Sequence, residues 1–247
     1  MEWRDEGLVI GLRRLGESSS VLEAMTRRHG RHLGLVRGAR SPRYAAALQP
    51  GNTLGLVWRA RIDEHLGAYA VEPLALRAGR FLPSAAALAA LGVIGPLLRL
   101  LPERDPHENL YDMLMALVDG LDDPARTPPA LARFEARMLE ECGFALDLSE
   151  CAATGTTQDL IYVSPKSARA VSRAAGEPYR DRMLPLPAFL RDEAARATAE
   201  DVAAAFRLTG YFLERELFGP RGQKLPEARE AFLNAMRRGA RAGGISS

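Results

Sequence analysis

Eight arginines lie in a stretch of the chain that contains no acidic residue. No Asp or Glu occurs between Glu23 and Asp63. The arginines of this stretch are Arg27, Arg28, Arg31, Arg37, Arg40, Arg43, Arg59 and Arg61. Each guanidinium offers a planar fork of hydrogen-bond donors and a charge that does not titrate, which suits contact with a phosphate backbone. We therefore predict that these arginines bind nucleic acid.

An ordinary solvated face is the alternative explanation. The chain prefers arginine throughout, because its 33 basic residues include only two lysines, Lys166 and Lys224. That preference explains why the basic residues are arginines. It does not explain why acids are missing from the same stretch, so the sequence favours nucleic acid over the alternative.

Charge changes along the chain. Residues 1–80 hold 13 Arg against 8 acidic residues, a net charge of +5, whereas residues 81–247 hold 20 Arg or Lys against 23 acidic residues, a net charge of −3. Because 247 residues exceed the usual size of one hydrophobic core, we predict two domains, at 1–80 and 81–238, followed by a flexible tail at 239–247.

The sequence carries no sign of a membrane or secretory protein. The first six residues include four charged side chains, and no apolar run reaches the ~20 residues that a membrane span needs. We expect a cytoplasmic protein, associated with the nucleoid if it binds DNA. Its two cysteines, Cys142 and Cys151, are then expected to be reduced thiols.

The apolar pattern of residues 1–80 is typical of short strands. Apolar residues alternate with polar ones between glycines and turn residues, which predicts strands at 7–15, 21–26, 32–37, 53–62 and 66–71. The segment 37–43 is expected to be a basic loop whose small residues let backbone amides approach an anion. Five short strands in one small domain predict an OB-type barrel, a fold that often binds single strands.

Beyond Pro83 the apolar period lengthens to that of helices. We predict helices at 85–94 and 97–101, separated by Gly95–Pro96, and helix starts at Asp105, Thr127 and Thr198. A last helix is expected at 227–238. The predicted fold class is therefore α+β, with the barrel followed by an all-α C-terminal domain that contains a small irregular insert at 151–187.

Residue patterns for catalysis are lacking. The sequence contains no G-x-S-x-G, no G-x-x-x-x-G-K-[ST] and no G-x-G-x-x-G element. His29 and His32 have the spacing of a metal pair but no third ligand nearby in the sequence. We predict that the protein is not an enzyme and needs no cofactor or metal.

Several short motifs occur in a fixed order along the chain. They are residues 16–19 (GESS), 26–30 (TRRHG), 37–41 (RGARS), 134–139 (FEARML), 142–144 (CGF) and Cys151. In order and spacing, over nearly the whole chain, they resemble the bacterial DNA repair and recombination family RecO. By motif position, the residues that match this family's basic N-terminal surface are Arg27, Arg28, Arg37, Arg40 and Arg43.

The resemblance implies both a fold and a function. It implies an N-terminal OB domain and a helical C-terminal domain. It also implies binding of single- and double-stranded DNA, ATP-independent strand annealing, and help in loading the recombinase RecA onto SSB-coated DNA. The implied partners are the protein RecR and the C-terminal tail of the single-stranded DNA-binding protein SSB.

One departure from the family concerns zinc. Many relatives carry two C-x2-C pairs in the helical domain, a strong motif for structural zinc. Here the corresponding stretches run from Cys151 to Thr154 and from Ser172 to Ala175, so one sulfur ligand of four remains. We therefore expect no zinc, and we expect the insert to be held by apolar packing.

The helical domain offers a candidate surface for a protein partner. Arg133 and Arg137 lie one helical turn apart, off the apolar stripe, and could line a groove for an acidic, apolar peptide. A solvated helix face is the alternative. Two other functions stay open: a protein adaptor that does not bind DNA directly, and a nucleic-acid enzyme with an unrecognised site.

Overall fold

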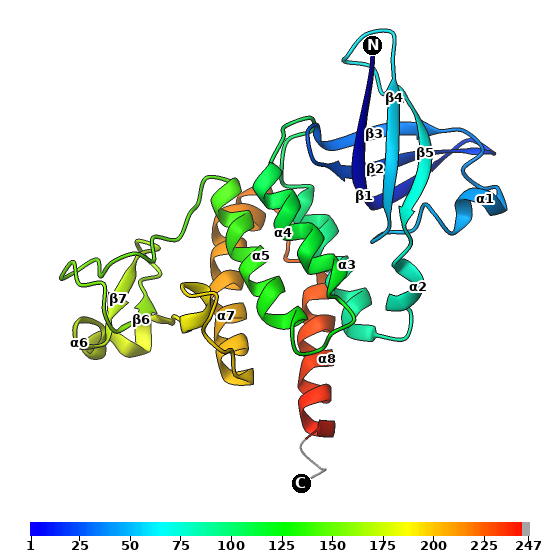
Figure 1. Ribbon diagram of the computed structural model, residues 1–247. Coiled ribbons are helices and arrows are strands. Elements are labelled where there is room, and N and C mark those ends of the chain that lie inside the picture. The colour runs from blue at the N-terminus through cyan, green and yellow to red at the C-terminus, as the bar shows by residue number, and fades with distance from the viewer. Residues whose placement is uncertain (244–247) are drawn as a thin grey trace. The chain divides into compact units, whose positions relative to one another are not determined.

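The computed structural model describes residues 1–243, which form two compact units (Figure 1). Unit 1 comprises Met1–Asp122 and Ala228–Phe232, and unit 2 comprises Asp123–Glu227 and the chain from Leu233 onward. The side chains of Arg43 and of residues 240–243 lie outside the described part of the structure. The domain boundary predicted after residue 80 falls inside unit 1 and stays a prediction.

Unit 1 begins with a closed barrel of five strands. The strands follow one another around the barrel in the order β1-β2-β3-β5-β4, which is the OB topology. Antiparallel pairs join most neighbours, and a parallel contact between Leu35 and Ala68 joins β3 to β5. The predicted OB-type barrel is confirmed. The strands are β1 (Glu2–Leu15), β2 (Ser19–Thr26), β3 (Gly30–Val36), β4 (Thr53–Arg59) and β5 (Ala68–Ala75).

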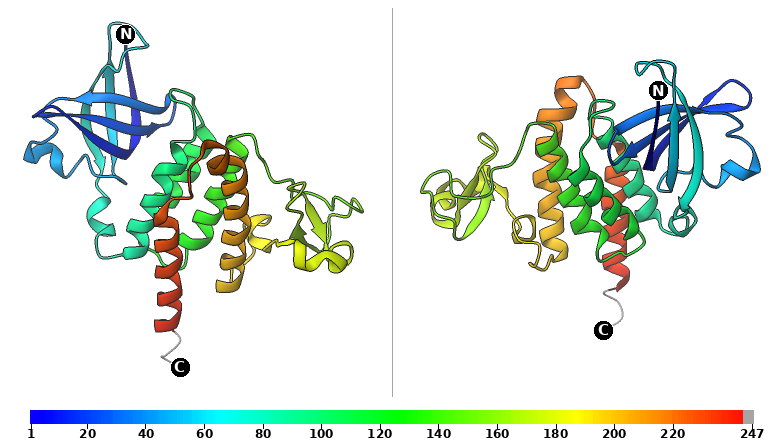
Figure 2. Two further views of the ribbon diagram at one scale, coloured as in Figure 1. Left: turned by 180° about the vertical axis from the view of Figure 1, so that it is seen from behind. Right: turned by 45° about the horizontal axis from the view of Figure 1, so that its top comes forward.

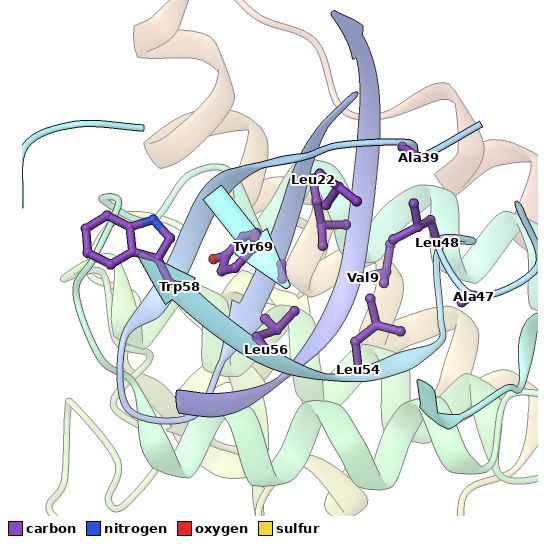
Figure 3. Close-up of a cluster of buried hydrophobic side chains, with 11 residues drawn as sticks. Val9, Leu22, Ala39, Ala47, Leu48, Leu54, Leu56, Trp58 and Tyr69 are labelled. Carbon is purple, nitrogen blue, oxygen red and sulfur yellow. The ribbon is translucent and has the colours of Figure 1, made fainter. Parts of the chain in front are cut away.

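Alternation along the strands fills the barrel. On β4, Leu54, Leu56 and Trp58 point inward and are at most 1% exposed, as the sequence pattern predicts (Figure 3). The predicted strand at 53–62 is too long, however. β4 ends at Arg59, and Ile62 is 47% exposed in the loop that follows.

The predicted basic loop contains a short helix. Residues 37–40 form a turn, and α1 (Pro42–Ala45) follows with Ser41 at its N-cap position. Pro42 starts this helix well because its missing N–H would have no partner in the first turn. Only the first part of the segment 37–43 is therefore a loop.

Three helices complete most of unit 1: α2 (Ala78–Phe81), α3 (Ala85–Leu98) and α4 (Glu108–Asp119). The predicted break at Gly95–Pro96 is wrong, because α3 runs through it. Pro96 removes one backbone hydrogen bond. The next two residues, Leu97 and Leu98, are fully buried, and this burial offsets the loss.

The starts of these helices agree only in part with the prediction. α3 starts where the predicted helix at 85–94 does, and Ser84 caps it, since the Ser84 side chain accepts the N–H of Ala87 at 3.1 Å. α4 begins three residues later than the predicted cap Asp105, with His107 at its N-cap position. The connection between α3 and α4 packs against the barrel so closely that a Cβ on Gly30 would meet the carbonyl oxygen of Asp105 at 1.9 Å.

Unit 2 is helical. Its main helices, α5 (Thr127–Glu141) and α7 (Ala199–Phe212), lie side by side (Figure 2). Thr198 starts α7 with the predicted cap, in a reciprocal capping box with Asp201. At its end, α7 gives way to a π-helical turn, η3 (Leu213–Phe218), and then to η4 (Gly219–Arg221).

The insert in unit 2 contains a small sheet of three short strands, in the order β7-β6-β8. The last helix, α8 (Glu227–Gly243), is longer than predicted. Residues 239–243 of the predicted tail are therefore helical, and 244–247 lie outside the described residues. The elements of the insert are β6 (Leu160–Val163), β7 (Ala170–Ser172), α6 (Arg173–Gly176), η1 (Glu177–Arg182), β8 (Leu184–Pro185) and η2 (Ala188–Leu190).

Candidate nucleic-acid interface

The hairpin between β1 and β2 places two arginines at one end of the barrel. Arg13 and Arg14 are exposed on the last part of β1. Arg14 pairs with Ser20 of β2, and Ser20 pairs with Val36 at the end of β3. The three strands therefore bring Arg14 beside the residue that precedes Arg37.

The turn after β3 is fastened to this hairpin. Arg37 and Arg40 are both exposed, and Gly38 between them has a positive φ of 64°, which glycine adopts without strain. The Arg40 guanidinium donates to the carbonyl oxygen of Glu17, in the hairpin turn, at 2.9 Å. A neutral carbonyl positions the guanidinium but does not neutralise its charge.

These residues form a basic surface that we call the hairpin patch. Its members share high exposure, and none of them pairs with a carboxylate among the side chains that the structure describes. They are Arg13, Arg14, Arg37 and Arg40. Arg43 follows in α1, and its predicted role stays a prediction. Arg13 and Arg14 are not among the arginines predicted from the sequence, because Glu17 and Glu23 separate them from the acid-free stretch.

Four other predicted arginines behave differently, and we call them the paired arginines. Each lies within 4 Å of at least one carboxylate: Arg27 with Asp112, Arg28 with Asp5, Arg31 with Glu23 and Glu103, and Arg59 with Glu2. All of these acids lie outside the acid-free stretch. Half of the arginines in the acid-free stretch are therefore paired with carboxylates from other parts of the chain, and their DNA-binding role stays a prediction.

The ion pairs of the paired arginines differ in how exposed their side chains are. Arg31 and Glu23 are each only 13% exposed, with their charged atoms 3.0 Å apart. Arg59 and Glu2 are exposed and lie 2.7 Å apart. Their hydrogen bond lowers the pKa of the Glu2 carboxyl and raises that of the Arg59 guanidinium.

Arg61 stands apart from both groups. It is exposed in the loop 60–67 between β4 and β5, which also carries Asp63 and Glu64. Arg104 holds this loop by donating to the carbonyl oxygens of Asp63 and His65. The neighbouring acids make the loop a weaker site for phosphate than the hairpin patch, and the role of Arg61 stays a prediction.

Of the two histidines with metal-like spacing, His32 lies on β3 and His29 lies in the turn before it. His32 is 1% exposed, and its Nδ1 lies 2.8 Å from the Tyr69 hydroxyl. Burial, followed by the charge of Arg104, lowers the pKa of His32 to about 4. His29 stacks on Trp3 at 4.0 Å and contacts Asp5. No group of three potential metal ligands occurs among the described side chains.

The proposed partner-binding arginines of unit 2 are engaged in internal contacts. Arg133 donates to the Phe189 carbonyl at 3.0 Å and lies over its ring. Arg137 pairs with Glu140 and Glu141. Both arginines are only partly exposed, so neither is a fully solvated side chain on the helix face. Their partner-binding role stays a prediction.

Cys151, the one sulfur ligand that remains of the zinc motif implied by the family resemblance, is a buried thiol. The Cys151 sulfur accepts the N–H of Ser172 at 3.3 Å. Burial alone would raise the pKa of this thiol, but hydrogen bonds from Ser172 and Thr154 outweigh it and lower the pKa to about 6. Leu160 and Val163, at the two ends of β6, are buried. The expectation of no zinc stays a prediction that metal analysis can check.

Unit 1 also contains an apolar groove of about 410 Å³. It lies between β1, the turn before β4, and helices α2 and α3. Arg99 is the one charged residue of its lining, and its guanidinium lies 2.7 Å from Glu23. The apolar residues of the lining are Ile10, Pro50, Ala78, Leu82, Leu88, Leu91 and Pro96.

Among the described residues, no helix has both the length and the apolar character to cross a membrane.

Comparison with known proteins identifies the family. Two family models match, "Recombination protein O N terminal" over residues 1–76 and "Recombination protein O C terminal" over residues 84–225. The chain is 60% identical to the DNA repair protein RecO of Methylocella silvestris, over 94% of this chain and 95% of that protein. It is 58% identical to the RecO of Beijerinckia indica, over 94% of each. It is 55% identical to that of Mesorhizobium japonicum, over 96% of this chain and 94% of the relative. The chain belongs to the RecO family of DNA repair proteins.

Proposed function

We propose that the protein binds single- and double-stranded DNA through the hairpin patch and anneals complementary strands without ATP. We further propose that it acts in the cytoplasm, at the nucleoid, and helps to load recombinase onto SSB-coated DNA together with RecR. One observation carries the DNA-binding part: four exposed arginines gather on a fastened hairpin and turn, and none of them is neutralised by a carboxylate among the described side chains.

The electrostatics of the hairpin patch support this proposal. Residues 9–22 and 35–52 together contain five arginines and one acid, Glu17. A phosphate can reach these guanidinium groups without first displacing a carboxylate. Each such contact releases counterions from the DNA, and no ion pair within the protein has to be broken. Fastening by Arg40 also fixes the turn before DNA arrives, which reduces the entropy lost on binding.

Alanine substitution of Arg37, Arg40 and Arg43 together tests this assignment. We expect weaker binding of a labelled single strand and a salt dependence that is flatter by about 0.7 for each lost phosphate contact. The matched control is Arg59→Ala, which removes an exposed arginine that is already paired with Glu2. Unchanged affinity in a folded triple variant would refute the hairpin patch as the DNA site.

Strand annealing needs its own measurement. Complementary labelled strands should pair faster with the protein than without it, and added ATP should make no difference. The described residues offer no group of metal ligands, and the sequence offers no nucleotide-binding loop, to support an ATP-dependent step. A requirement for ATP would contradict this part of the proposal and would reopen the alternative of an enzyme.

The family resemblance also leads us to propose RecR and the SSB tail as partners. The apolar groove of unit 1 is a feature that could accept an apolar segment, because most of its lining residues are apolar. Leu88→Asp should then weaken binding of a labelled acidic, apolar peptide. Leu74→Asp is the control, because Leu74 is similarly exposed but lies outside the groove. Peptide binding by a protein that fails to bind DNA would instead favour the adaptor.

A further inference from the structure

The hairpin that carries the basic patch also exposes two leucines. Leu12 is 42% exposed and Leu15 is 48% exposed, on either side of Arg13 and Arg14. Leu12 pairs with Leu22, which is fully buried in the barrel core. The inward row of β1 therefore leaves the barrel and continues onto an open hairpin.

Each face of this hairpin combines a leucine with an arginine. Leu12 and Arg14 point to one side of β1, and Arg13 and Leu15 point to the other, because neighbouring side chains alternate along a strand. The two residues of each face are about 7 Å apart along the strand. An apolar contact and a cation are thus presented together on both faces.

Exposed leucines taken singly are ordinary, and unit 1 has others. Leu74 and Leu76, on and just after β5, are each 55% exposed. Neither belongs to a group of unpaired arginines, and Glu72 is exposed nearby in sequence. What distinguishes Leu12 and Leu15 is their place among four cations that attract a polyanion.

We propose that Leu12 and Leu15 contact unstacked nucleobases of single-stranded DNA while the hairpin patch holds its phosphates. This inference rests on the proposed function. A single strand can turn its base faces toward apolar side chains, whereas a duplex keeps them stacked inside and offers the same surface only phosphates. The two leucines therefore make the hairpin patch prefer single strands over duplex.

This preference has a consequence for annealing. When two bound strands pair, their bases leave the leucines and stack on one another, so only the phosphate contacts with the hairpin patch remain. The duplex is then held more weakly than the strands from which it formed. The leucines thus favour release of the annealed product.

The double variant Leu12→Ser/Leu15→Ser tests the inference. We expect about a 10-fold loss of affinity for a single strand of mixed sequence, from the lost apolar contact area, and little change for a duplex. The salt dependence should stay as in the wild type, because no phosphate contact is removed. Leu74→Ser is the matched control and should change neither affinity.

An abasic single strand separates the base contact from effects on folding. The wild type should bind an abasic strand about 10-fold more weakly than a normal one, and Leu15→Ser should reduce this difference. Leu15 is suited to this test because it pairs with Ser19 at the end of the hairpin, away from the core. Equal binding of abasic and normal strands by the wild type, or an equal loss for single strand and duplex in the leucine variants, would overturn the inference.

These outcomes are distinct from failure of the proposed function. If Arg37→Ala/Arg40→Ala leaves both the affinity and the salt dependence unchanged, the hairpin patch is not the DNA site and both proposals fall. If the arginine variant weakens single strand and duplex alike while the leucine variants leave their ratio unchanged, only the base contact is refuted.

Discussion

The hairpin patch and the paired arginines use the same residue type on one small barrel, and they differ in what the rest of the chain brings to them. Carboxylates reach the paired arginines from the start of β1, from β2 and from the chain beyond the barrel. None reaches the hairpin patch among the described side chains. The charge that an arginine can offer to a ligand is therefore set by tertiary contacts and not by the local sequence.

The difference also has an energetic side. A phosphate that approaches a paired arginine must compete with a carboxylate already in place, and in the Arg31–Glu23 pair that carboxylate is mostly withdrawn from water. An exposed pair such as Arg59–Glu2 resists less, since surface ion pairs are worth little. The Arg31–Glu23 pair therefore contributes to the stability of the fold, whereas a phosphate that approaches the hairpin patch has no described carboxylate to displace.

The largest effect that we expect concerns pH, to which the two regions should respond differently. Near the paired arginines, His32 has a folded-state pKa of about 4, below its ordinary value of 6.5. The unfolded chain therefore takes up this proton first. The free energy of unfolding should fall by about 3 kcal/mol as the pH drops from 6.5 to about 4, and this part of the fall should stop below that pH.

Urea unfolding at a series of pH values checks this expectation. Replacing His32 by Asn should lower the stability at pH 7 but flatten its dependence between pH 6.5 and 4. DNA binding by the hairpin patch should change little between pH 8 and 6.5, because arginine does not titrate there. An unchanged pH dependence in the His32 variant would show that other groups control it.

The second prediction removes the hairpin patch completely. Alanine at Arg13, Arg14, Arg37 and Arg40 should weaken single-strand binding about 100-fold at low salt and reduce the salt slope by about 3. The same change at Arg27, Arg28 and Arg59 should cost less than about 3-fold, since these guanidinium groups are already paired. Fluorescence anisotropy at several salt concentrations measures both, and comparable losses in the two variants would erase the distinction between the regions.

The third prediction concerns stability, for which a paired arginine should matter more than an arginine of the hairpin patch. Arg31→Ala should lower the free energy of unfolding by about 2 kcal/mol, because it leaves the largely buried carboxylate of Glu23 with one cation fewer. Arg37→Ala should change it by less than about 0.5 kcal/mol, as is usual at exposed sites. Equal effects of the two substitutions, measured in urea, would mean that the depth of the Arg31 pair does not matter.

The sequence predicts the fold better than it predicts the candidate site. Alternation on β4 predicted Leu54, Leu56 and Trp58 as core, because period two follows directly from strand geometry. Pro96 led to the wrong prediction of a helix break. The burial of Leu97 and Leu98, which keeps α3 intact, depends on the tertiary structure and not on the local sequence. The ion pairs of the site could not be predicted for the same reason, because pairs such as Arg27–Asp112 join residues 85 positions apart.

A local signal existed for the two arginines that were missed. Arg13 and Arg14 stand at the end of a strand, directly before the turn residues of Gly16–Ser19, and that position alone predicts exposure. Arg13 and Arg14 lie outside the acid-free stretch, because Glu17 and Glu23 follow them in the sequence. The Glu17 backbone, not its carboxylate, meets the patch at Arg40.

The smallest effect that we expect comes from removing one carboxylate that pairs with exposed arginines. Glu2→Gln removes the carboxylate that lies 2.7 Å from Arg59 and 3.8 Å from Arg4, while keeping a side chain of the same size. Both guanidinium groups are then exposed and without this carboxylate. The affinity for DNA should rise about 2-fold, and the salt slope should steepen by about 0.7 for each freed guanidinium that a phosphate reaches. Glu72→Gln is the control, because it removes an equal charge from β5 without freeing an arginine. If both variants gain equally, the gain reflects net charge alone, and pairing would not be what separates the two groups of arginines.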